Sequence, residues 1–339
     1  MRRMKEICPT TEKYKGENKM NNITMESFQY LIKEKIEEKL GDQCKVVPQN
    51  VTKNNGIRLQ GLMISSKESN VSPTIYMNHF YERYQGDEMT LDDTVSEILH
   101  IYHHHKLNHH IKMESFLEFS QARKKIFFKL INTEANWELL KDVPHRDFLD
   151  LSIVYVYEVK GERLGNASIT IRNSHLDAWK ISEEELHEAA EKNTPQMHPY
   201  HIESLHKVMQ EICMEQWKEQ AQSNVEESED EADMMNLIMN MQDDCGMYVL
   251  SNKTRMFGAA CMLYDNIIKD FSTACGKNLM ILPSSIHEIL MLPVEDSSDA
   301  DHFKQCVMDV NRTQLEAEDI LSDSVYYYNL EIDELTKIK

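Results

Sequence analysis

Residues 46–64 read VVPQNVTKNNGIRLQGLMI, with an apolar run on each side of Asn54-Asn55-Gly56. An Asn-Gly pair supplies the left-handed backbone that a tight hairpin turn requires, so this stretch predicts two antiparallel strands. Residues 148–159 and 167–172 form a second such pair, joined by a turn at 160–165. Hairpins that alternate with helical segments indicate the α+β class, in which helices pack on antiparallel or mixed sheets.

The helices are marked by capping signals and by the spacing of apolar residues. Thr90 with Asp93, and Ser182 with Glu185, have the spacing of a capping box, and Thr194-Pro195 is expected to end the second of these helices. Apolar positions predict further helices near residues 24–40, 201–218, 267–275 and 303–310. Further strands are expected near residues 73–77, 126–131, 247–251, 257–263, 279–282, 286–292 and 325–328.

The composition changes near residue 219. Five of the six residues 226–231 are acidic, and their mutual repulsion opposes compaction. We therefore predict two α+β modules that are joined by an acidic linker and preceded by a flexible leader in which Met20 is an alternative start to Met1. The predicted bounds are 1–22 for the leader, 23–218 for the N-terminal module, 219–246 for the linker and 247–339 for the C-terminal module.

An apolar, methionine-rich island at residues 234–241 interrupts the acidic linker. Methionine side chains adapt to irregular surfaces, so this island has the character of a segment that docks in a groove of its own chain or of a partner. A short linker helix resting on either module explains the same pattern equally well.

Charge and cysteine usage limit the location and the partners. The net charge of −20 over 339 residues disfavours binding to nucleic acids and to anionic membranes. No apolar run approaches the roughly 20 residues that span a bilayer, and no apolar stretch of a signal peptide follows the N-terminal arginines. The seven cysteines are scattered and form no Cys-x-x-Cys pair, which predicts free thiols in a reducing compartment, the cytoplasm.

Histidines crowd the segment from His100 to His110. His100 and His104 are one helical turn apart, the spacing at which two imidazoles share a metal ion. Nearby apolar residues already define the buried face of this helix, so we expect the histidines to face solvent and the protein to hold no native metal. Adventitious zinc or nickel binding is expected, and it should weaken as the imidazoles become protonated near about pH 6.

Several catalytic motifs are present only in part. His187-Glu188 and His287-Glu288 lack the second histidine that a zinc protease helix requires. His145-Arg146-Asp147 resembles a kinase catalytic loop, but the metal-binding asparagine expected five residues after the aspartate is Ser152. Glycine-rich phosphate loops and a Gly-x-Ser-x-Gly elbow are absent from the sequence, and we expect no cofactor.

Polar residues that interrupt the apolar strands are the remaining candidates for a site. A nucleophile and base are available in Ser284, Ser285, His287 and Glu288, with Lys253 and Arg255 as cations. Candidate binding residues are Asn173, His175, Asn252 and Asp323. Adjacent strand residues point to opposite faces, which limits which of them meet, and turn or capping roles compete with a shared site.

The order of these polar motifs resembles that of an uncharacterised bacterial family, domain of unknown function 5688, over about residues 25–330. The motifs are Ser72–Tyr76, Leu140–Arg146, Asn173–Leu176, Asn252–Ala260, Leu282–Ser285 and Leu321–Tyr328. The segment from Pro283 to Leu292 is also similar to domain of unknown function 1444. The resemblance implies a bacterial cytoplasmic protein of a single full-length architecture, and it implies no activity.

Three functions are compatible with these observations. The first is a non-catalytic interaction or regulatory protein with a protein partner, which the incomplete catalytic motifs, the acidic surface and the methionine-rich linker favour. The second is a small-molecule enzyme of the hydrolase type that uses the Ser284 to Glu288 group. The third is metal handling through the histidine run His100–His110.

Overall fold

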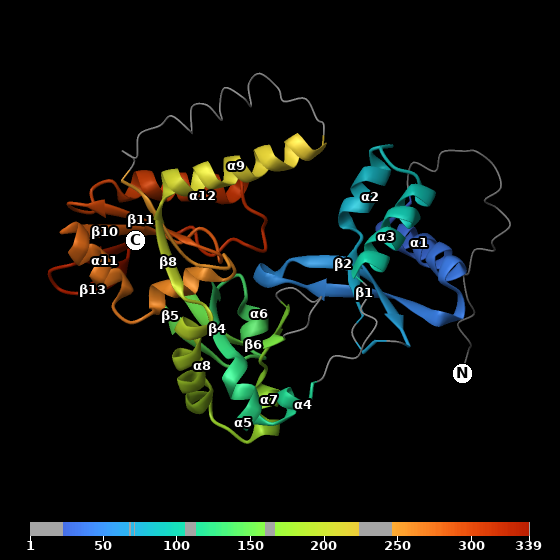
Figure 1. Ribbon diagram of the computed structural model, residues 1–339, viewed down its shortest axis with the longest axis horizontal. Coiled ribbons are helices and arrows are strands. Elements are labelled where there is room, and N and C mark those ends of the chain that lie inside the picture. Colours follow the sequence, from blue (N-terminus) through green and yellow to red (C-terminus); the bar gives the residue numbers. More distant parts are fainter. Residues whose placement is uncertain are drawn as a thin grey trace, which may run out of the picture. The chain divides into compact units, whose positions relative to one another are not determined.

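The computed structural model describes residues 23–67, 69–70, 72–105, 113–159, 167–223 and 246–338. The fold is α+β, with three antiparallel sheets and packed helices (Figure 1). Contacts divide the chain into two compact units. Unit 1 comprises Met1–Val51 and Leu59–Ile111, and unit 2 comprises Thr52–Arg58 and Lys112–Lys339.

The described residues of unit 1 form a three-stranded sheet with three α-helices. Its elements are α1 (Met25–Leu40), β1 (Cys44–Thr52), β2 (Arg58–Ser66), β3 (Thr74–Tyr76), α2 (Asn78–Gln85) and α3 (Leu91–His105). Thr24 caps α1, and the expected Thr90–Asp93 capping box at α3 is confirmed by two reciprocal backbone hydrogen bonds of 3.1 Å. Phe28, Ile32 and Ile98 are fully buried in the core between the helices and the sheet.

The hairpin between β1 and β2 is confirmed, and its tip belongs to unit 2. Asn55 and Gly56 adopt positive φ angles of 58° and 68°, as the Asn-Gly signal requires. The side-chain amide of Asn55 donates to the carbonyl of Ile320 at 2.6 Å, and its side-chain oxygen accepts a hydrogen bond from the amide of Asn136 at 2.9 Å. The tip residues are therefore fixed by specific hydrogen bonds within unit 2.

A four-stranded sheet forms the first half of unit 2. Its strands are β4 (Ile126–Asn132), β5 (His145–Phe148), β6 (Leu151–Val159) and β7 (Ala167–Thr170). One edge of β6 pairs with β4, and β5 and β7 also pair with β6. The helices of this half are α4 (Glu114–Leu117), α5 (Phe119–Ala122), α6 (Trp137–Leu140), α7 (Asn173–Trp179) and α8 (Glu183–Met197). Figure 1 shows α8 beside β4.

A six-stranded antiparallel sheet of order β13-β12-β10-β11-β9-β8 forms the second half. Its strands are β8 (Tyr200–Ser204), β9 (Tyr248–Asn252), β10 (Asn278–Leu282), β11 (Ile289–Val294), β12 (Tyr326–Asn329) and β13 (Glu334–Lys337). The helices are α9 (Leu205–Ser223), α11 (Ile267–Cys275), α12 (Ala300–Thr313) and the 3-10 helix η5 (Gly258–Leu263). Residues from both sheets share one core, and Met280, Leu292 and Val307 form a smaller core under α12.

The observed division of the chain differs from the expected boundary at 219–246. β8 lies before that segment and β9 lies after it, yet the two strands pair in one sheet. The single core of unit 2 likewise joins residues on both sides of the acidic run. A charged connection between two paired strands does not separate two cores. Along the sequence, the boundaries between the compact units instead fall after residue 111 and on either side of the hairpin tip, residues 52–58.

Other local expectations also need correction. The helix expected from residue 201 begins at Leu205, because residues 200–204 pair with β9. The strand expected at 257–263 is η5, and α8 continues through Pro195 to Met197. The leader 1–22, the turn 160–165, linker residues 224–245 and the methionine-rich island 234–241 lie outside the described residues. No described helix combines the length and apolar character needed to cross a bilayer.

Candidate functional site

Three segments of unit 2 meet around His287, and we call this place the His287 junction. They are the loop 252–258 after β9, the connection 283–288 between β10 and β11, and the segment 317–324 before β12. The backbone N–H of Ile286 donates to the carbonyl of Asp319 at 2.9 Å, and that of Ala259 donates to the carbonyl of Ile286 at 3.3 Å. Motifs that are far apart in sequence therefore lie side by side.

Both ring nitrogens of His287 are engaged. The backbone N–H of Phe257 donates to Nδ1 at 3.3 Å, and Nε2 lies 3.2 Å from a carboxylate oxygen of Asp319. The imidazole also stacks on the Phe257 ring, with centroids 5.9 Å apart. An amide N–H only donates, so Nδ1 carries the lone pair and Nε2 carries the proton that faces Asp319. The lone pair that a general base needs is thus already used.

The predicted serine nucleophiles do not contact the imidazole. The Ser285 hydroxyl is buried and accepts the backbone N–H of His287 at 3.0 Å. The Ser284 carbonyl accepts the N–H of Leu321 at 2.7 Å. Within the part of unit 2 that the structure describes, neither Ser284 nor Glu288 shares a hydrogen bond with the His287 ring. A nucleophile and base are therefore not assembled by this geometry.

Asn252 organises the loop that reaches His287. Its side-chain oxygen accepts the hydroxyl of Thr254 at 2.8 Å, and its amide donates to the carbonyl of Met256 at 2.7 Å. Arg255 and Phe257 take left-handed φ angles of 51° and 55°, which are strained for residues with a Cβ atom. The buried Asn252 thus holds a strained loop against the histidine.

The two predicted cations of this loop, Lys253 and Arg255, have different surroundings. Arg255 donates to Glu211 of α9 at 2.9 Å, while Lys253 is exposed and donates through its backbone to the carbonyl of Pro199 at 3.3 Å. A Cβ atom at Gly258 would lie 2.1 Å from the Ser251 hydroxyl, so only glycine fits there. The loop is closely packed, and Arg255, the cation of the loop with a side-chain partner among the described contacts, pairs with Glu211 of α9.

The other predicted binding residues fall in different places. Asn173 donates to the carbonyl of Asp142 through its backbone at 2.9 Å, and His175 accepts the backbone N–H of Arg172 at 3.0 Å as a cap of α7. Burial, with a smaller effect of the Arg172 charge, lowers the pKa of His175. Asp323 accepts the amide of Asn311 at 2.7 Å. These contacts give each residue a capping or loop-holding role.

Lys129 on β4 is a residue of the junction that the sequence reasoning missed. Its ammonium lies 4.5 Å from the centroid of the Phe257 ring, and no carboxylate among the described residues pairs with it. Burial, together with the positive charge of Lys53, lowers the pKa of Lys129 to about 8. A single lysine inside the apolar run 126–131 was the available signal.

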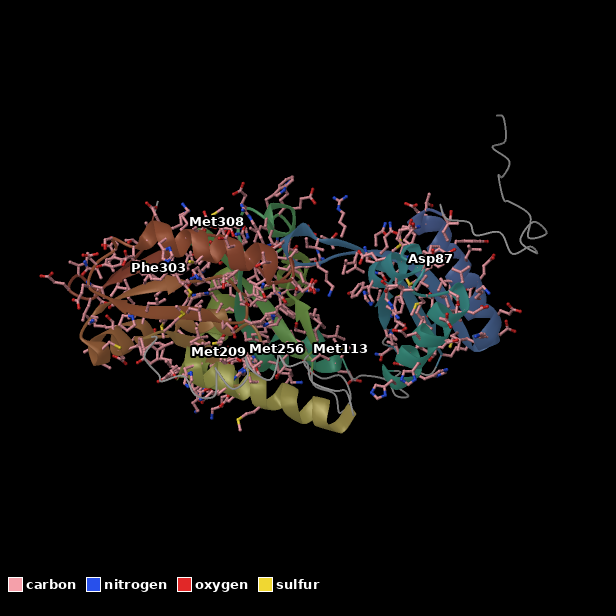
Figure 2. The ribbon with its side chains drawn as sticks, turned by 90° about the horizontal axis from the view of Figure 1, so that it is seen from above. Asp87, Met113, Met209, Met256, Phe303 and Met308 are labelled. Carbon is pink, nitrogen blue, oxygen red and sulfur yellow. The ribbon has the colours of Figure 1, made fainter. Side chains whose placement is uncertain are left out.

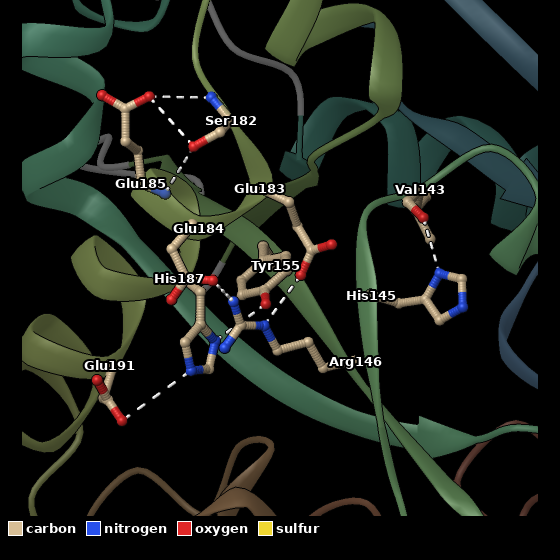
Figure 3. A network of polar contacts seen from close by, with 10 residues as sticks. All are labelled: Val143, His145, Arg146, Tyr155, Ser182, Glu183, Glu184, Glu185, His187 and Glu191. Carbon is tan, nitrogen blue, oxygen red and sulfur yellow. Dashed lines mark hydrogen bonds and ion pairs between the residues drawn. The ribbon is translucent and has the colours of Figure 1, made fainter.

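A separate polar network connects β5, β6 and α8 (Figure 3). Arg146 bonds to Glu183 at 3.0 Å and also to Glu184, while the Tyr155 hydroxyl lies 3.0 Å from Nδ1 of His187. Burial, and then the charge of Arg146, lower the pKa of His187. The partial motifs around Arg146 and His187 therefore serve a structural network, and the expected capping box of Ser182 with Glu185 begins α8.

The histidine run begins on α3 in unit 1. The rings of His100 and His104 are stacked with centroids 6.5 Å apart, and His103 and His104 are exposed. Residues 106–112 lie outside the described part of the chain. In the ranges that are described, no group of three or more histidine, cysteine or acidic residues has a metal-binding arrangement.

Comparison with known proteins gives a family and no activity. No curated protein matches this chain, and no solved structure matches it. The sequence profile named Family of unknown function (DUF5688) matches residues 25–330, which include all the motifs that meet at the His287 junction. The match covers most of the 339 residues, so the chain belongs to this family.

Proposed function

We propose that the protein is a non-catalytic binding protein with an interaction or regulatory role. The observation that carries this proposal is the state of His287, whose Nδ1 lone pair accepts the backbone N–H of Phe257. A base with no available lone pair cannot take a proton from Ser284 or Ser285. The polar residues of the junction then have the function of fixing the loop and the connections that surround them.

Labelling with a fluorophosphonate, a reagent that reacts with activated serines, tests the absence of catalysis. We expect the purified full-length chain to remain unlabelled at neutral pH, as inactive serines do. A Ser285→Ala variant is the matched control. Labelling of the wild-type chain that disappears in Ser285→Ala would show an activated serine and would support the hydrolase function instead.

Helix α9 offers a surface for a protein partner. Met209 and Ile212 are three residues apart on one face of the helix and expose 37% and 41% of their area, and Figure 2 marks Met209. Exposed apolar side chains of this kind are typical of interaction surfaces, and methionine adapts to the shape of a partner. We propose that the apolar surface of another protein covers this face of α9.

Co-purification from the source cells tests this surface with a matched pair of variants. Ile212→Glu places a charge on α9, whereas Ile332→Glu changes another exposed isoleucine, 61% exposed, in the turn before β13. We expect one specific partner with the wild-type chain and with Ile332→Glu, and its loss with Ile212→Glu. Equal recovery with both variants, or no partner with any chain, would contradict the role of α9.

We also propose a bacterial cytoplasmic location and no nucleic-acid partner. The described cysteines Cys44, Cys213, Cys261, Cys275 and Cys306 are all free, as suits a reducing compartment. The net charge of −20 opposes binding to phosphate backbones.

A second candidate function is carbonyl chemistry at Lys129. An amine whose pKa is about 8 is partly neutral at neutral pH, and its lone pair adds to an aldehyde carbon, with loss of water, to give an imine. Incubation with pyridoxal followed by borohydride reduction, then peptide mass spectrometry, tests this. We expect modification of Lys129 to exceed that of the exposed Lys124, and equal modification would remove this candidate.

A further inference from the structure

A second place in unit 2 has the features of a binding site, and it lies apart from the His287 junction. It is a cavity of about 270 Å³ between β4, α8, the start of β8 and the segment 263–267. Ligand pockets commonly range from about 300 to 1,000 Å³, so this cavity suits a small ligand. None of the residues that were predicted as site residues lines it.

Aromatic rings form much of its wall. Phe128 and Tyr264 meet edge to face, with centroids 6.3 Å apart and an angle of 75° between the planes. The Tyr264 hydroxyl donates to the carbonyl of His198 at 2.9 Å, which fixes the ring and occupies its polar end. Tyr200 at the start of β8 is half-exposed and adds a third ring. The negative faces of such rings attract cations.

The ionisable groups that line the cavity, apart from the tyrosines, are two carboxylates. Asp265 is exposed in the segment before α11, and Glu191 projects from α8, where Figure 3 shows it beside His187. The Nε2 atom of His187 is 4.0 Å from Glu191, but burial, followed by the charge of Arg146, lowers the pKa of His187 and so weakens this ion pair. Among the described residues, no lysine or arginine lines the cavity.

We propose that this cavity binds a small organic cation, with an ammonium group against the aromatic rings and the carboxylates of Glu191 and Asp265 beside it. The combination of ring faces and carboxylates is the one that recognises ammonium groups carrying methyl substituents. The net charge of −20 adds a long-range field that attracts a cation and repels an anion. This inference goes beyond the proposed function, because the residues that line the cavity belong neither to the His287 junction nor to α9.

Isothermal titration with choline, and with its neutral analogue 3,3-dimethylbutan-1-ol, tests the charge requirement. The two molecules have the same shape and differ in the quaternary nitrogen. We expect saturable choline binding that is roughly tenfold or more tighter than binding of the neutral analogue, because the ring faces and carboxylates favour only the cation. Equal binding of the two, or no saturable choline binding at low millimolar concentration, would overturn the proposal.

Variants locate the binding. Glu191→Gln and Asp265→Asn should each weaken choline binding by roughly three- to tenfold, and Tyr200→Leu by a similar factor. Glu188→Gln changes an exposed carboxylate of the same helix that does not line the cavity, and it should leave binding unchanged. Circular dichroism confirms that each variant is folded. Equal effects of Glu188→Gln and Glu191→Gln would show general electrostatic attraction and would overturn the assignment of the cavity.

A further measurement on the same samples distinguishes failure of the cation site from failure of the proposed function. Proton NMR after a long incubation follows whether choline is recovered intact. Absence of binding contradicts only the cation site, because the fluorophosphonate and α9 experiments do not depend on it. Bound choline that is converted to a product contradicts the non-catalytic function while leaving the cation site in place.

Discussion

Lys129 provides the sharpest test of the electrostatics at the His287 junction. Burial and the charge of Lys53 lower the pKa of Lys129 from 10.5 to about 8, so the folded state disfavours its charge. Each pKa unit corresponds to about 1.4 kcal/mol, and this drop is equivalent to about 3 kcal/mol of lost stability at pH 7. Lys129→Met removes this cost and keeps most of the apolar stem, but it loses a cation–π contact worth about 1 kcal/mol.

We therefore expect Lys129→Met to raise the free energy of unfolding by about 2 kcal/mol at pH 7. The folded pKa lies below the unfolded value, so the penalty is complete below about pH 8 and declines as the pH rises toward 10.5. The difference in the free energy of unfolding between the variant and the wild type should thus decrease by about 2 kcal/mol between pH 7 and pH 9.5.

Urea unfolding followed by tryptophan fluorescence at both pH values measures this difference. Lys124→Met, at an exposed position five residues earlier in the chain, is the control and should change stability by less than about 0.5 kcal/mol. A destabilised Lys129→Met, or a stabilisation of equal size at pH 7 and pH 9.5, would refute the reasoning.

Three further predictions follow from the packing and the titrating groups. Gly258→Ala should lower stability by about 2 kcal/mol or more in urea unfolding, because the new Cβ atom would lie 2.1 Å from the Ser251 hydroxyl. Burial alone would raise the pKa of Asp150. The hydroxyls of Tyr326, Ser324 and Ser322 donate hydrogen bonds to its carboxylate, and together they lower the pKa below its usual value. The free energy of unfolding of the wild type should then fall as the pH drops from about 4 through this lowered pKa. In urea titrations Asp150→Asn should lose less stability over this pH range than the wild type, and a larger loss would contradict the role of Asp150. Nickel binding by untagged protein should weaken in His104→Ala, because His100 and His104 are one helical turn apart. Elemental analysis that finds tightly bound metal after purification without a nickel column would contradict solvent-facing histidines.

Local signals were sufficient to predict many of the elements. The α+β class, the Asn55-Gly56 turn and the capping boxes all depend on residues that are close in sequence, and all are present. The pairing of β8 with β9 joins residues across the acidic run, and no local pattern encodes it. Residues 200–204 mix polar and apolar side chains at the margin of a helical pattern, which led to a helix prediction for a strand.

The sequence predicted several residues of the candidate site but not the partners that they contact. Asn252, Ser285 and His287 do meet, but their partners Phe257 and Asp319 come from segments whose proximity depends on the tertiary fold. The roles also depend on which atom of each residue is in contact, since Ser285 bonds to the His287 backbone and not to its ring. The spacing of two residues in the sequence does not show which of their atoms are in contact.

The protonation of His287 tests the non-catalytic proposal most directly. Long-range proton–nitrogen NMR of the imidazole distinguishes a nitrogen that carries a proton from one that carries a lone pair. We predict that Nε2 carries the proton that faces Asp319, that the lone pair of Nδ1 accepts the Phe257 N–H, and that the nitrogen shifts are unchanged in Ser285→Ala. A ring protonated on Nδ1, with an Nε2 lone pair whose shift responds to Ser285→Ala, would instead indicate a working serine–histidine pair.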